Sequence, residues 1–253
     1  MSGSSEREKR KAERLRAESA TDAGERRTRL MQLAAGAAFL AVAVVLVLIV
    51  VNSSSSGSGG DTKLEGAAEV NQRLAGIPQE GMVLGDPKAP VEVVEFADLQ
   101  CPYCKAFTEE ALPPIIENQV KNGEVKLAFH NFTIIGEQSL PAGAAALAAG
   151  AQRRGWNFVE LFYRNQGAEA SGYADDAFLE AVAKGAGIKD LGKWNAERDK
   201  FTAEVEETTA EAERLGFNGT PSIAIRGPKT DGLEAIETPG STGDLEAAIE
   251  AAE

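Results

Sequence analysis

The sequence contains very few of the side chains that bind metal ions. Its 253 residues include two cysteines, Cys101 and Cys104, and one histidine, His130. A structural zinc site needs about four cysteine or histidine ligands, and a disulfide-rich domain needs several cysteine pairs. The composition excludes both. We therefore expect no metal ion and no bound cofactor, and any sulfur chemistry must lie in this one pair.

Basic side chains are also scarce. The chain has 26 Lys and Arg against 39 Asp and Glu, a net charge of −13. Residues 1–29 contribute nine basic and six acidic side chains, or +3, so residues 30–253 carry −16. An acidic domain repels phosphate backbones, and we expect no nucleic acid among its partners.

Polar side chains are absent from Leu33–Val51, a run of nineteen residues. About 20 apolar residues cross a bilayer as a helix. Basic residues cluster just before the run, at Arg26, Arg27 and Arg29, and the next one is Lys63. The positive-inside rule then puts the N-terminus in the cytoplasm and the rest of the chain outside.

The alternative is a cleaved signal peptide, but the leader and the apolar core are both longer than is usual. We predict a cytoplasmic basic leader over residues 1–29 and a single uncleaved transmembrane signal anchor over residues 30–51. Residues 52–61 are a Ser/Gly linker that spans roughly 15–20 Å on average. Residues 62–253 are long enough for one exported domain with its own core.

The two cysteines form the motif Cys101-Pro102-Tyr103-Cys104. It follows the strand-like run Val91–Ala97 and opens a helical stretch to about Asn122, which Pro113-Pro114 is expected to kink or interrupt. A CxxC pair where a strand ends and a helix begins is typical of a dithiol/disulfide redox centre. The free N–H groups of the helix start favour the thiolate of the first cysteine. A purely structural disulfide across so short a loop stabilises little.

Further elements follow from the hydrophobic pattern. We predict a strand over 124–129, several helices over 139–216, a proline-led strand over 219–225 and a return strand over 235–238. A last helix is predicted over 245–252, capped by the segment 241–244 (STGD). Breaks in the helical stretch are expected at Gly155, Gly172 and Gly192. Without the helical stretch the order is β-α-β followed by β-β-α.

This order is that of the thioredoxin fold. With a helical domain inserted at about 138–217, the chain resembles the membrane-anchored, DsbA-like thiol:disulfide oxidoreductases of Gram-positive bacteria. Four segments carry the resemblance: 76–79 (GIPQ), 84–90 (LGDPKAP), 93–104 (VVEFADLQCPYC) and 219–223 (GTPSI). The resemblance implies an α/β fold of this class, preceded by the transmembrane helix.

It also implies roles for site residues. Cys101 is then the exposed nucleophile and Cys104 the buried resolving thiol, and their disulfide is the redox group. Pro102 and Tyr103 help to set the reduction potential. Pro221 is a cis-proline facing the sulfurs, with Thr220 placed to hydrogen-bond an extended substrate. The alternative for Pro221 is a trans-proline that starts an edge strand.

Glu95 lies six residues before Cys101 and, by strand alternation, shares a face with apolar residues. A carboxylate on an apolar face is costly unless it has a role. By resemblance it is a buried proton acceptor near Cys104, and the alternative is a solvated position at the sheet edge. His130 has no partner in the sequence and is interpreted as structural.

The predicted function is an extracytoplasmic, membrane-tethered oxidase that introduces disulfides into exported proteins with thiols. In this family such an enzyme is reoxidised by a membrane redox partner of the DsbB or VKOR type. A reductase or isomerase using the same site is the alternative, because the direction of electron flow depends on a difference of potentials. A non-redox binding or chaperone module is a third possibility.

Overall fold

A computed structural model describes residues 64–253 of the chain. The predicted leader, transmembrane anchor and linker fall before this range and lie outside the described residues. Within residues 64–253, no helix has the length and apolar character needed to cross a membrane.

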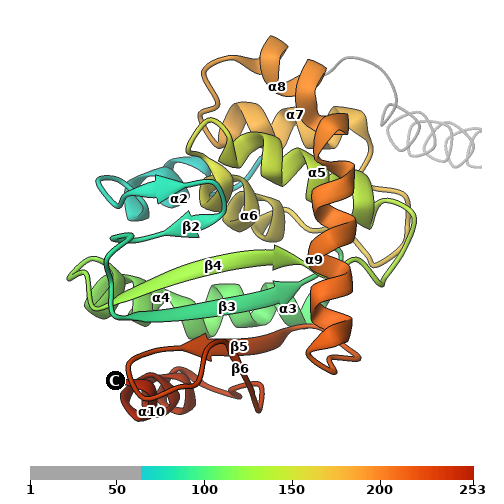
Figure 1. Cartoon of the computed structure of the whole chain (residues 1–253). Coiled ribbons are helices and arrows are strands. Elements are labelled where there is room, and N and C mark those ends of the chain that lie inside the picture. Colours follow the sequence, from blue (N-terminus) through green and yellow to red (C-terminus); the bar gives the residue numbers. More distant parts are fainter. Residues whose placement is uncertain (1–63) are drawn as a thin grey trace, which may run out of the picture. The chain divides into compact units, whose positions relative to one another are not determined.

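A six-stranded sheet forms the centre of the described chain (Figure 1). Its strands, in spatial order, are β1 (Gln79–Glu80), β2 (Val83–Leu84), β4 (Val125–Asn131), β3 (Val91–Ala97), β5 (Ser222–Arg226) and β6 (Glu234–Ile236). The two long strands β3 and β4 run parallel, and every other pairing is antiparallel. The three strands predicted around the motif and the proline are therefore confirmed.

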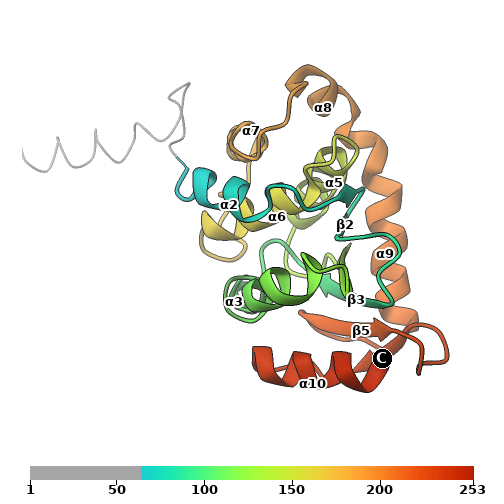
Figure 2. The same ribbon diagram turned by 90° about the vertical axis from the view of Figure 1, so that its left-hand side faces the viewer.

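The central strand β3 is apolar because it is covered on both faces, as buried parallel strands are. Val94 and Phe96 point to one face, where they pack with Ala212 of α9 (Thr202–Arg214). Val93 and Ala97 point to the other face and join the main core. Figure 2 shows α9 on one side of the sheet and α3 on the other.

The helix that follows the CPYC motif is continuous but irregular. It consists of α3 (Pro102–Ala106), a π-helical segment (Phe107–Ala111), α4 (Leu112–Ile115) and a second π-helical segment (Ile116–Val120). Pro113 and Pro114 have no N–H to donate, which interrupts the α-helical ladder around them as predicted. The Thr242 hydroxyl, at the start of α10 (Thr242–Ala252), donates to the Ala111 carbonyl of this helix at 3.1 Å.

The helical insertion lies at the β1 side of the sheet, above β4 in Figure 1. It comprises α5 (Ser139–Gly150), α6 (Gly155–Arg164), α7 (Asp176–Gly185), α8 (Leu191–Glu197), a 3₁₀ turn (Arg198–Phe201) and α9. Its apolar side chains form one continuous core with the sheet. These helices follow β4 and precede β5 along the chain.

Two of the three predicted helix breaks are correct. Gly155 begins α6, and Gly172 lies in the loop before α7. The prediction at Gly192 is wrong, because that residue lies in the first turn of α8, where Asp190 caps the helix by accepting from the Lys193 amide at 2.8 Å. The chain instead breaks at Gly187, whose φ of +79° suits glycine.

The C-terminal unit is a β-hairpin followed by a helix. β5 and β6 pair antiparallel, and α10 (Thr242–Ala252) packs under the sheet near β5. Ser241 caps α10 as predicted, although the helix begins three residues earlier than the pattern suggested. An additional helix, α2 (Ala67–Arg73), and the short strands β1 and β2 precede the motif and were not predicted.

Candidate redox site

Cys101 lies in the turn between β3 and α3. Its backbone is extended (φ −77°, ψ 122°), and it is the N-cap residue of α3, with Pro102 in the first turn. Proline suits this position because it has no N–H to leave unpaired and its φ matches the helix. The Cys101 amide donates to the Asp98 carbonyl at 2.9 Å, which closes the turn between β3 and α3.

The two thiols differ strongly in acidity. A hydrogen bond from the Cys104 thiol is the main cause that lowers the pKa of Cys101 to about 6. Burial opposes this shift, while hydrogen bonds from Thr220 and from the amides of Cys104 and Tyr103 add to it. Burial raises the pKa of Cys104 far above its usual range, and the neighbouring Cys101 and Glu95 add to the effect. Cys101 is therefore the thiolate at neutral pH and Cys104 the protonated thiol.

The expectation that Cys101 is exposed is wrong. Only 2% of its surface is accessible, because its sulfur faces the Thr220 carbonyl at 3.4 Å and its own carbonyl is covered by the Gln166 side chain. Tyr103, between the two cysteines, is 76% exposed instead.

Glu95 is buried in the main core beneath the cysteines. It is 2% exposed, on a strand with neighbours on both sides, which excludes the solvated sheet edge. Neither carboxylate oxygen has a hydrogen-bond partner among the described residues. Burial, and next the charge of Cys101, raises the pKa of Glu95 to about 8, and the nearby Thr108 hydroxyl offsets this only in part. Glu95 is thus a protonated acid at neutral pH.

The Thr220–Pro221 peptide bond is cis. Pro221 leads into β5, which is an interior strand paired to both β3 and β6, so the edge-strand alternative does not hold. Thr220 and Pro221 border a groove of about 580 Å³ together with Tyr103, Phe107 and residues of the 238–242 segment. The redox-active sulfur, the proline loop and an open groove are thus side by side.

His130 lies on β4, away from the cysteines. Its Nδ1 is 3.1 Å from the Glu211 carboxylate, and its ring meets the edge of Phe96 on the sheet face opposite Glu95. This is the structural setting that was predicted for it. Across residues 64–253, no group of three or more His, Cys, Asp or Glu side chains is placed to hold a metal ion.

Several residues that organise the site were missed in the sequence. The buried carboxylate of Asp98 accepts from the amides of Gln100, Ile134 and Ile135 at 2.8–2.9 Å. The side chains of Tyr163 and Gln166, from the insertion, donate to backbone carbonyls of the same turn. Asp98 could have been predicted to form an Asx turn with the amide of Gln100, two residues later. No signal in the sequence links the motif to Tyr163 and Gln166, which lie about sixty positions away.

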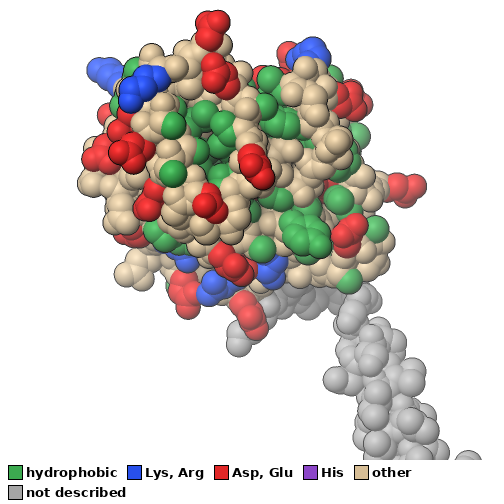
Figure 3. Space-filling model, turned by 90° about the horizontal axis from the view of Figure 1, so that it is seen from below, with side chains coloured by type: hydrophobic (Ala, Val, Ile, Leu, Met, Phe, Trp, Pro, Cys, Tyr) green, Lys and Arg blue, Asp and Glu red, His purple; other side chains and the backbone are tan. Residues whose placement is uncertain are grey.

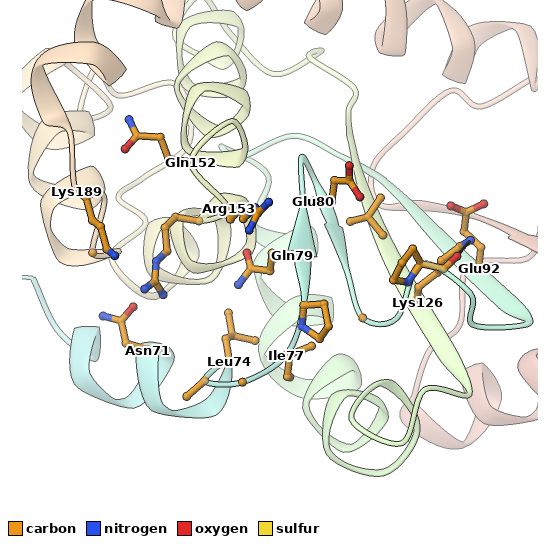
Figure 4. Close-up of a pocket in the computed structure, with 18 residues that line it drawn as sticks. Asn71, Leu74, Ile77, Gln79, Glu80, Glu92, Lys126, Gln152, Arg153 and Lys189 are labelled. Atoms are coloured by element: carbon orange, nitrogen blue, oxygen red, sulfur yellow. Dashed lines mark hydrogen bonds between the residues drawn. The ribbon is translucent and has the colours of Figure 1, made fainter.

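A cavity of about 1020 Å³ is not part of this site (Figure 4). Glu92 and Lys126 border it near the starts of β3 and β4, whereas the cysteines follow the end of β3. Its other walls come from α2, from the segment leading into β1 and from the insertion, including Arg153 and Lys189. The redox chemistry and this cavity therefore occupy opposite ends of the strands.

Comparison with known proteins agrees with the fold and with the site. A family model described as Thioredoxin matches residues 78–251. A probable disulfide bond formation protein D from Bacillus cereus is 31% identical over 153 residues, which cover 57% of this chain and 69% of that protein.

Two solved structures are similar over most of the described chain. The oxidised form of BdbD from Bacillus subtilis superposes with a TM-score of 0.60 at 24% identity, covering 69% of this chain and 96% of BdbD. A thioredoxin-like oxidoreductase from Silicibacter pomeroyi DSS-3 has a TM-score of 0.53 at 28% identity, with 66% and 89% covered. The chain therefore belongs to the thioredoxin family and, within it, to the DsbA-like thiol:disulfide oxidoreductases.

Proposed function

We propose that this protein is an extracytoplasmic oxidase that introduces disulfides into exported proteins through Cys101 and Cys104. The observation that carries the proposal is the inequality of the two thiols, with the pKa of Cys101 lowered to about 6 and that of Cys104 raised. A stabilised thiolate favours the reduced form of the enzyme, which makes its disulfide a strong oxidant.

The reaction follows from this inequality. A substrate thiolate attacks Sγ of Cys101 in the disulfide form, and the sulfur of Cys104 leaves and takes a proton. Glu95, whose pKa is about 8, holds that proton beside Cys104. A second substrate thiolate then attacks the substrate sulfur, and Cys101 leaves as a thiolate. Two electrons pass from the substrate to the enzyme, which ends as the dithiol.

The groove of about 580 Å³ is the proposed binding place for the substrate chain. Tyr103, Phe107 and Pro221 give it an apolar floor, and Thr220 offers backbone groups next to Cys101. An extended peptide lying there would pair with the backbone by strand addition, which is largely independent of sequence. A thiol-containing, unfolded segment of an exported protein fits this requirement.

The proposal also includes the cellular location of the protein and the reoxidation of its dithiol. The apolar run at 33–51 is the proposed single-pass anchor, with the N-terminus in the cytoplasm and the catalytic domain outside, where disulfides persist. A membrane protein of the DsbB or VKOR type is the proposed oxidant of the dithiol. Acidic side chains are spread over the face shown in Figure 3, with few basic ones, which argues against a nucleic-acid partner.

A stoichiometric transfer experiment tests the proposal. The oxidised protein is mixed with a reduced peptide that contains two cysteines, and the peptide disulfide is quantified. The expected result is one peptide disulfide for each enzyme disulfide consumed, and none with Cys101→Ser. If Cys101→Ser supports the same biological function as the parent protein, the non-redox binding module replaces the oxidase.

A further inference from the structure

The insertion reaches the redox turn through one side chain. Gln166, just after the end of α6, donates from Nε2 to two backbone carbonyls, that of Leu99 at 2.8 Å and that of Cys101 at 3.1 Å. These two carbonyls belong to the turn that connects β3 to α3. One amide group therefore fixes the direction of the Leu99–Gln100 and Cys101–Pro102 peptide units.

Neighbouring contacts show that the same turn is held from the insertion at several points. The Tyr163 hydroxyl donates to the Asp98 carbonyl at 3.2 Å, and the Gln100 side chain donates to the Ser139 hydroxyl at 2.9 Å. Tyr163 lies in α6 and Ser139 begins α5. Among these contacts, that of Gln166 is the one made to the nucleophilic residue itself.

Cys101 is held on both sides by hydrogen bonds to its backbone. Its amide donates to Asp98, and its carbonyl accepts from the Lys105 amide at 3.1 Å as well as from Gln166. The orientation of this residue decides whether the amides of Tyr103 and Cys104 point at Sγ, and both of these amides lower the thiol pKa. The Gln166 N–H also offsets the negative end of the Cys101 carbonyl, which lies close to the thiolate.

We infer that Gln166 is a positioning residue for the redox reaction, by which the helical insertion sets the acidity and oxidising power of Cys101. This inference rests on the proposed function, because it assumes that Cys101 takes part in disulfide exchange. It assigns to the insertion a role in the chemistry, in addition to packing.

The test compares Gln166→Met with Gln152→Met in the full chain. Gln152 is a matched control, because its side chain also bridges backbone groups of the insertion, donating to the Asp190 carbonyl at 2.8 Å and accepting from the Asp190 amide at 3.1 Å. It makes no contact with the redox turn. For each variant, the Cys101 pKa is measured from thiolate absorbance, the equilibrium constant with glutathione from trapped redox mixtures, and stability from denaturant unfolding.

We expect Gln166→Met to raise the Cys101 pKa by about 0.5 unit or more, the size of one lost hydrogen bond. The equilibrium constant for oxidising glutathione should fall by about threefold, since a less stable thiolate makes a weaker oxidant. Gln152→Met should change stability only. Gln166→Asn keeps the amide but is too short to reach both carbonyls, and it should give an intermediate pKa if the methionine variant does not fold.

An unchanged Cys101 pKa in either Gln166 variant, with a loss of stability like that of Gln152→Met, would show that Gln166 is structural only and would overturn the inference. Failure of the proposed function looks different. In that case the unsubstituted protein itself does not equilibrate with glutathione, whatever residue stands at position 166.

Discussion

At the scale of single residues, the proposed exchange reaction depends on the buried acid Glu95 and on two neighbouring thiols with different pKa values. Glu95 has no hydrogen-bond partner in the described chain, and its pKa is raised to about 8 by burial. A side chain of this kind destabilises the folded state unless it is protonated. We propose that its place on an otherwise apolar strand face serves the proton that Cys104 gains and loses in each cycle.

The first prediction concerns this proton. Glu95→Gln keeps the shape of the side chain but removes the ionisable group. We expect the exchange steps in which the Cys104 sulfur leaves or attacks to slow by about 10-fold or more near neutral pH, within the usual range of general acid–base effects. Stopped-flow mixing with a reduced peptide measures the rate. Equal rates in both proteins, at every pH, would remove Glu95 from the mechanism.

The second prediction concerns stability. The pKa of Glu95 rises from 4.5 in the unfolded chain to about 8 in the folded one, so the folded state binds the proton more tightly. The stabilisation is complete below pH 4.5 and is lost as the pH rises toward 8. Relative to Glu95→Gln, the free energy of unfolding of the reduced protein should fall by roughly 3–5 kcal/mol across this window. Parallel pH curves for the two proteins would contradict the raised pKa.

The third prediction separates the two cysteines. In the reduced protein, the alkylation of Cys101 should follow a titration with a midpoint near pH 6, because only the thiolate reacts. Cys104 is fully buried and should stay unmodified until the protein unfolds. Mass spectrometry of protein alkylated at a series of pH values measures both sites. A midpoint near the ordinary thiol value of 9.0 would contradict the site described here.

At the scale of elements, the strands around the motif were predictable because their signals are local. β3 alternates apolar side chains between two covered faces, and the CPYC motif with Pro102 marks the helix start. The order of elements then led to the thioredoxin fold. The helix break predicted at Gly192 was wrong because a glycine is tolerated in the first turn of a helix when a neighbouring Asp supplies the N-cap.

Other features of the site could not be predicted from local sequence patterns. The burial of Cys101 depends on Gln166 and on Thr220, which lie 65 and 119 positions away in the chain. The burial of Glu95 required knowing that β3 is central, and thus that β5 pairs on its far side. Contacts between distant segments are decided by packing, and no sequence period reports them.

A prediction at this scale tests whether the insertion is stabilised by its helix caps. The Asp175 carboxylate accepts from the Phe178 amide at 2.9 Å and caps α7. Asp175→Ala should lower the free energy of unfolding by about 1 kcal/mol, while Asp175→Asn, which retains a capping acceptor, should cost much less. Denaturant unfolding measures both. Equal losses in the two variants would show that the cap is not the source of the effect.

At the scale of the whole molecule, the cavity of about 1020 Å³ borders the starts of β3 and β4, whereas the cysteines follow the end of β3. The helical insertion of the described chain lies on one side of the sheet (Figure 1). The predicted topology has a direct test. Protease added outside intact cells should digest the domain but leave a tag at residue 1 protected, and the reverse pattern would contradict the orientation.

The proposed oxidation of substrate thiols is tested most directly by the reduction potential of the Cys101–Cys104 pair. Equilibration of the protein with glutathione buffers, followed by trapping of free thiols, gives this value. We expect a potential near that of the strong oxidant DsbA, about −120 mV. A value near that of thioredoxin, about −270 mV, would contradict the oxidase proposal and would make the protein a reductase.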